Sequence, residues 1–237
     1  MAPPTHADRE RRILSLWERA VGRPRRDRDE ALLDDAGGPR ALGERNRALI
    51  AIRTGLFGRD WPLKSGCQAC GGVCEFAIDG VVLAENLELM AAGGGEGVVE
   101  WQGREIVLRA LTADDLDAVA GRPDVSSAVR SLAARCIPAE VEPGELTEDQ
   151  IDLIGQHLER LDPAAMISLA LECPDCGHRW PAPIDVGDAL WTEVQRSAER
   201  LLTEIDALAR AYGWTEEEVV GLSPVRRAAY LQLVAAS

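Results

Sequence analysis

The longest regular hydrophobic pattern in the chain lies in its last third. Apolar side chains recur there at alternating steps of three and four residues: Trp191, Val194, Ala198, Leu201, Ile205, Leu208 and Tyr212. This spacing predicts a helix of about 26 residues, which starts at Val186 and is ended by Gly213. A stripe this narrow requires a helical partner along its length. The partner is either the N-terminal helices of the same chain or a helix of another subunit.

Helical patterns also flank this segment on both sides. Apolar residues at helical spacing over 13–21 predict a first helix, and Gly22 and Pro24 end it. A short charged helix is expected over residues 27–35, and a third over 42–57. Beyond Gly213, Thr215 and Glu218 form a capping box, and Ser223 followed by proline starts a last helix.

The middle of the chain alternates between strand-like and helical segments. Residues 75–78 and 81–84 read as strands, and residues 98–101 and 105–108 read as a hairpin. Helices are predicted after the cap Thr112, over 126–136, and over 148–160, where Thr147 and Gln150 form a capping box. Residues 166–171 read as a strand. The pattern therefore predicts an α+β fold that is mostly helical.

Two cysteine pairs carry the strongest chemical signal. Each is a Cys-x-x-Cys followed by glycine and a short strand-like segment: Cys67 with Cys70, and Cys173 with Cys176. Two such turns supply the four sulfurs of a closed tetrahedral zinc site, which leaves no position for water or substrate. We expect a structural Zn²⁺ bound by these four residues. The alternative is a pair of reduced, metal-free turns; a redox motif would normally sit between a strand and a helix.

The remaining cysteines and histidines give weaker signals. Cys74 lies near the first pair and either packs within a strand or competes as a ligand. Cys136, in an apolar helical run, is expected to be a small buried hydrophobic residue. His178 follows the second pair and could hydrogen-bond a ligating sulfur, whereas His157 is expected to be a flanking helix residue.

The two pairs are far apart in sequence, so a domain-sized insertion must separate them. We expect N-terminal helices over residues 1–62, then a split four-cysteine zinc ribbon over 63–185 that encloses a small inserted α+β unit. The long helix and a short helical tail follow over 186–237. No apolar run is long enough to cross a bilayer, and the N-terminus has no apolar signal core. These features predict a cytoplasmic protein without membrane insertion.

Charge disfavours nucleic acid as a partner. The net charge is −14, and residues 1–60 hold thirteen arginines against ten acidic residues, so the rest of the chain carries −17. Acidic residues also flank the cysteine pairs: Glu75, Asp79, Asp175 and Asp185. Nucleic-acid binding depends on basic side chains that neutralise phosphates. An acidic surface instead favours contacts with proteins.

The order of these pieces resembles the baseplate proteins of contractile-tailed phages and of related extracellular contractile injection systems. The resemblance rests on the N-terminal helices, the first cysteine pair, and the run from Leu161-Asp162-Pro163 to Cys173-Pro-Asp-Cys176-Gly-His-Arg-Trp180. Its most specific part is the tail, Ala209-Arg-Ala-Tyr-Gly-Trp-Thr-Glu-Glu-Glu-Val and Leu222-Ser-Pro-Val-Arg-Arg-Ala-Ala-Tyr230. The first pair departs from the pattern, since it lacks the internal proline and has the additional Cys74.

The resemblance implies a structural or assembly role at the baseplate or hub without enzymatic activity. The partners would then be other baseplate, hub or spike subunits of a contractile tail-like particle. The alternative function is a zinc-ribbon module that binds nucleic acid or takes part in transcription. An enzyme is disfavoured because none of His6, His157 and His178 lies in a metalloprotease or nucleophile motif.

Overall fold

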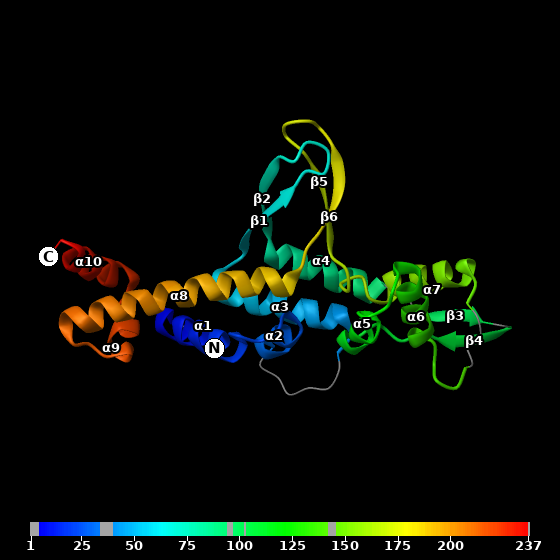
Figure 1. Cartoon of the computed structure of the whole chain (residues 1–237), viewed down its shortest axis with the longest axis horizontal. Helices are drawn as coiled ribbons and strands as arrows, with labels where there is room; N and C mark the ends of the chain where they lie inside the picture. The colour runs from blue at the N-terminus through cyan, green and yellow to red at the C-terminus, as the bar shows by residue number, and fades with distance from the viewer. Residues whose placement is uncertain (1–4, 34–39, 94–96, 102, 142–145, 237) are drawn as a thin grey trace. The chain divides into compact units, whose positions relative to one another are not determined.

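The computed structural model describes residues 5–33, 40–93, 97–101, 103–141 and 146–236. The chain divides into two compact units, one made of residues 1–35 and 187–237 and the other of residues 36–186. Over the described residues the fold is α+β, with many helices, three two-stranded antiparallel sheets and a long helix near the C-terminus (Figure 1). The fold class expected from the sequence is confirmed. The division at residues 62 and 185 stays a prediction.

The first unit is helical. It contains α1 (His6–Ala20), α2 (Arg25–Leu32), nearly all of α8 (Val186–Tyr212), α9 (Glu216–Gly221) and α10 (Pro224–Ala235). The stripe of α8 is buried within the chain at Leu190, Trp191, Val194, Ala198, Leu201 and Leu208. The same chain therefore covers most of the expected helical seam. Gly213, with a φ of +69°, ends the helix where the spacing predicted.

A buried ion cluster ties three helices of the first unit together. The guanidinium of Arg227 on α10 donates from Nη1 to Glu10 Oε2 at 2.7 Å and from Nη2 to Glu10 Oε1. Its Nε lies 2.7 Å from a carboxylate oxygen of Glu204 on α8. The hydrogen bond to Glu10 raises the pKa of Arg227, and the charge of Glu204 adds to this effect. Arg227 thus stays charged although it is almost fully buried.

The second unit starts with α3 (Leu42–Phe57) and the hairpin of β1 (Asp60–Gly66) and β2 (Val73–Asp79). The strand expected over residues 81–84 is wrong, because these residues form the start of α4 (Gly80–Gly93). The Asp79 carboxylate accepts hydrogen bonds from the backbone N–H groups of Val81 and Val82. This contact caps a helix where the β-branched pair suggested a strand.

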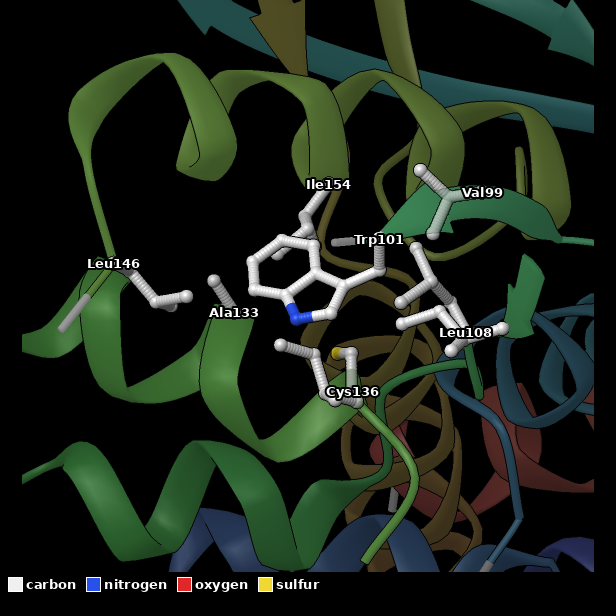
Figure 2. Packing of buried hydrophobic residues seen from close by; sticks show 9 residues of the cluster. Val99, Trp101, Leu108, Ala133, Cys136, Leu146 and Ile154 are labelled. Carbon is white, nitrogen blue, oxygen red and sulfur yellow. The ribbon is translucent and has the colours of Figure 1, made fainter. Parts of the chain in front are cut away.

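Between the two cysteine hairpins in sequence, the second unit forms a small α+β core. It is built from β3 (Val98–Trp101), β4 (Arg104–Val107), α5 (Ala113–Val119), α6 (Val125–Cys136) and α7 (Glu148–Leu161). Figure 2 shows the indole of Trp101 among side chains of α6 and α7, including Cys136 and Ile154. The expected hairpin, the three helices, the cap Thr112 and the capping box of Thr147 with Gln150 are confirmed. Thr112 also forms a capping box with Asp115.

Asp115 is the most tightly held carboxylate of this core. It accepts hydrogen bonds from Arg109 at 2.6 and 2.8 Å, from Arg135 at 2.7 Å, and from the backbone N–H of Thr112 at 2.9 Å. Arg109, with help from the backbone of Thr112 and from Arg135, holds the pKa of Asp115 well below its ordinary value of 3.8. The carboxylate therefore fixes the start of α5 to the end of α6.

A second aspartate joins distant parts of the unit. Asp162, just after α7, accepts a hydrogen bond from the backbone N–H of Gly43 in the first turn of α3 at 2.8 Å. Asn46 also donates to the carbonyl of Ala164 at 2.8 Å. The chain then enters β5 (Ser168–Glu172), which pairs with β6 (Arg179–Pro183). Among the described residues, no helix is both long and apolar enough to cross a bilayer.

Candidate metal centre

The two cysteine pairs lie in matching turns. The first turn (residues 67–72) joins β1 to β2 and the second (residues 173–178) joins β5 to β6; we call them the first and second knuckle. In each turn the backbone N–H of the first cysteine donates a hydrogen bond to a backbone carbonyl on the other side of the turn. The N···O distance is 2.8 Å from Cys67 to Gly72 and 2.9 Å from Cys173 to His178. Gly71 and Gly177 have φ values of +76° and +70°, which glycine adopts without strain.

The four cysteine sulfurs converge on one point. The Sγ atoms of Cys67, Cys70, Cys173 and Cys176 all lie within 4.8 Å of one another. The Cys67–Cys176 distance is 3.7 Å and the Cys70–Cys173 distance is 3.6 Å. Four sulfurs at about 2.3 Å from one ion would be about 3.8 Å apart, whereas a disulfide is about 2.0 Å long. All four cysteines are free. The arrangement therefore fits a tetrahedral metal site.

Backbone N–H groups favour the ionised form of the first cysteine in each knuckle. The N–H of Cys70 lowers the pKa of Cys67, and the N–H of Ala69 acts in the same direction. In the second knuckle, the N–H groups of Cys176 and Asp175 lower the pKa of Cys173 to about 6. These two sulfurs are also the buried members of the set. At neutral pH the Cys173 sulfur is therefore mostly thiolate, and the pKa of Cys67 is shifted in the same direction.

The second cysteine in each knuckle resists ionisation. The N–H of His178 lowers the pKa of Cys176, but burial and the other three sulfurs outweigh it and raise the pKa to about 12. For Cys70, the N–H of Gly72 acts to lower the pKa, yet the net direction is upward because of Cys173 and Cys67. Four thiolates so close together repel one another, so a cation must be present for all four to ionise.

Apolar side chains pack against the centre. Cys74, Trp180, Ala182 and Leu171 form one small cluster with Cys67 and Cys173. Cys74 lies in β2, where burial raises its pKa, and it is not among the four residues whose ligand atoms converge. Its interpretation as a strand-packing residue is thus supported. The ring of His178 is parallel to that of Trp180, with centroids 5.9 Å apart.

The other candidate residues lie elsewhere. Cys136 is fully buried in the core of Figure 2, where burial raises its pKa to about 11, so its expected role as a small hydrophobic residue is confirmed. His157 is an exposed residue of α7 that contacts the carbonyl of Leu153. Neither takes part in the metal centre.

Two features of the centre were not recognised in the sequence. One is β1, which pairs with β2 and holds the first knuckle. The other is Gly72, where a Cβ atom would lie 2.8 Å from the Asp175 carboxylate and 3.3 Å from Cys70 Sγ. Because Gly72 has no side chain, the two knuckles can lie close to each other at this point. The Gly-Gly pair after Cys70 was the available signal.

Comparisons with known protein families, with curated proteins and with solved structures found no match for this chain.

Proposed function

We propose that the chain is a non-enzymatic structural or assembly component of the baseplate, in its hub region, of a phage tail or contractile injection system. The proposal rests on the resemblance of the cysteine pairs and of the tail. Its partners would be other baseplate, hub or spike subunits, with neither nucleic acid nor membrane lipid among them. The protein would be made in the cytoplasm and assembled into a tail-like particle.

The observation that carries a structural role is the closed set of four sulfurs. Cys67, Cys70, Cys173 and Cys176 would fill every position of a tetrahedral ion and leave none for substrate. We propose Zn²⁺ as the ion, since four thiolates at this spacing suit it. Bound zinc would supply the positive charge that lets Cys70 and Cys176 ionise.

The positions of the four sulfurs in the chain indicate how a bound metal would stabilise the fold. The knuckles lie 103 residues apart between Cys70 and Cys173, and each is carried by a two-stranded sheet. An isolated two-stranded hairpin is marginally stable in water. A shared ion would join the two hairpins and close the loop that contains the core of Figure 2.

Metal analysis tests the zinc proposal directly. Protein purified without chelator should contain close to one zinc per chain, and Cys173→Ser should contain none and unfold at lower temperature. Cys74→Ser is the matched control, since this buried cysteine is outside the convergent set, and it should keep the metal. A zinc-free wild type, or full stability in Cys173→Ser, would refute the structural role.

Deletion and complementation test the assembly role. Cells lacking the chain should form no complete contractile particles by electron microscopy, and the wild-type chain should restore them. Cys173→Ser should fail to do so. Mass spectrometry of purified particles then separates a resident subunit from one that leaves after assembly. Normal particle numbers without the chain would overturn the proposal.

A further inference from the structure

The four cysteines differ in their access to solvent. Cys70 and Cys176, the second residue of each pair, are exposed, whereas Cys67 and Cys173 are buried. Two sulfur–sulfur distances below 4 Å cross between the knuckles, and each joins an exposed cysteine to a buried one. Cys176 lies 3.7 Å from Cys67, and Cys70 lies 3.6 Å from Cys173.

This arrangement combines the two parts of a thiol oxidation site. A small oxidant reaches an exposed sulfur first, and a neighbouring sulfur then resolves the oxidised product as a disulfide. Here each exposed sulfur has a buried neighbour on the opposite knuckle at less than 4 Å.

We propose that the centre is also a site of oxidation by hydrogen peroxide, which converts it into two disulfides between the knuckles, Cys67–Cys176 and Cys70–Cys173. The proposal rests on the proposed zinc site for the metal that is released. It goes beyond that site because the link between the knuckles survives the loss of the ion.

The reaction balances for each pair. In the zinc-loaded protein Cys176 would be a thiolate; it attacks one oxygen of the peroxide, the O–O bond breaks, hydroxide leaves, and Cys176 becomes a sulfenic acid. The Cys67 thiolate then attacks the oxidised sulfur, the S–O bond breaks, and a second hydroxide leaves as the disulfide forms. Two thiolates lose two electrons and one peroxide gains them. Cys70 and Cys173 react in the same way.

Disulfide formation ends metal binding because disulfide sulfurs carry no charge. Two peroxides per chain should therefore release one zinc and reduce the thiols measured in denaturant from six to two. The two remaining thiols are Cys74 and Cys136, which are buried and lie outside the convergent set.

Trypsin gives a direct readout of the pairing. Cleavage after Lys64, Arg104, Arg160 and Arg179 places Cys67 and Cys70, together with Cys74, in one peptide and Cys173 and Cys176 in another. Zinc-loaded protein treated with peroxide should yield these two peptides joined, four hydrogens lighter than their sum. Sequencing the joined pair by mass spectrometry should assign the two bonds as proposed. Cys74→Ser, the matched control, should give the same bonds.

Other products would overturn the proposal. Two separate peptides, each two hydrogens lighter, would mean that disulfides form within the knuckles. Sulfinic acid at Cys70 or Cys176 would mean that the buried sulfurs do not resolve the oxidised ones, and unchanged thiols would mean that peroxide does not react. If the purified protein holds no zinc, only the zinc proposal fails. The disulfide proposal can still be tested, because the reduced, metal-free protein can be treated with peroxide and its disulfides mapped in the same way.

Discussion

Replacing Gly43 by alanine should destabilise the protein, although alanine normally stabilises a helix. Gly43 lies in the first turn of α3, and its N–H donates to the buried carboxylate of Asp162. A Cβ atom on Gly43 would lie 1.7 Å from Asp162 Oδ1, 2.6 Å from its Cγ and 3.0 Å from the Cβ of Ala164. The carboxylate would have to move by more than a bond length, which breaks the hydrogen bond.

The size of the effect follows from three contributions. Loss of a helix-capping contact costs about 1–2 kcal/mol, and a buried acceptor left without its donor costs about 1–3 kcal/mol. The higher helix propensity of alanine returns about 1 kcal/mol. The free energy of unfolding should therefore fall by about 1–4 kcal/mol. Urea denaturation followed by far-UV circular dichroism measures it.

Gly55→Ala, in the same helix, is the matched control. A Cβ atom there would meet nothing within 4 Å, so this variant should gain about 0.5–1 kcal/mol. The two substitutions are chemically identical and should have opposite signs. A Gly43→Ala protein as stable as the wild type would refute the close approach of Asp162. Adding Asp162→Ala to Gly43→Ala should cost little more, because both remove the same contact.

Three further predictions concern charge and metal. The pKa of Asp115 is depressed in the folded protein, so the carboxylate stabilises the fold above about pH 4 and this stabilisation is lost as the pH falls. Asp115→Asn should therefore lower the free energy of unfolding by about 2 kcal/mol at pH 7. Between about pH 5 and pH 3 this variant should lose less stability than the wild type. Arg227→Met should lower the unfolding temperature because it leaves Glu10 and Glu204 without their cation, and adding Glu10→Gln should recover part of the loss. A chelator should lower the unfolding temperature of the wild type, and added zinc should restore it.

These predictions have clear contrary outcomes. An Asp115→Asn protein with the pH profile of the wild type would show that the two arginines do not depress the pKa of Asp115. Additive losses in the Arg227 and Glu10 variants would show that the pair is not coupled. A chelator without effect on the unfolding temperature would contradict a stabilising metal.

Local sequence signals predicted much of this fold. The caps Thr112, Thr147 and Thr215 each bond to the residue three positions later, and Gly213 ends α8 by its own backbone conformation. The convergence of the four cysteines was also predictable, because residues suited to bind a metal are few in type and recur at characteristic spacing. Such signals depend on residues within four positions of one another in the sequence, so they can be recognised without knowledge of the tertiary structure.

The missed elements depend on distant contacts. The start of β1 is held by Arg53 of α3, which donates to the carbonyls of Gly58 and Asp60 and covers the ring of Trp61. Proline, lysine and glycine within β1 gave no strand pattern. The cap between Asp162 and Gly43 spans 119 residues, and the pair of Glu10 with Arg227 spans 217. No local pattern encodes either contact.

The sequence separation of the knuckles also has a consequence for synthesis. The first knuckle leaves the ribosome 103 residues before Cys173, which is about 5–20 s of translation at 5–20 residues per second. During that interval the nascent chain offers two sulfurs, half of what a four-sulfur ion needs. The core of Figure 2 lies within the same interval and can fold before the proposed ion would be bound. Loading of the proposed zinc would thus be a late event, and a chain that stops before Cys176 would never complete it.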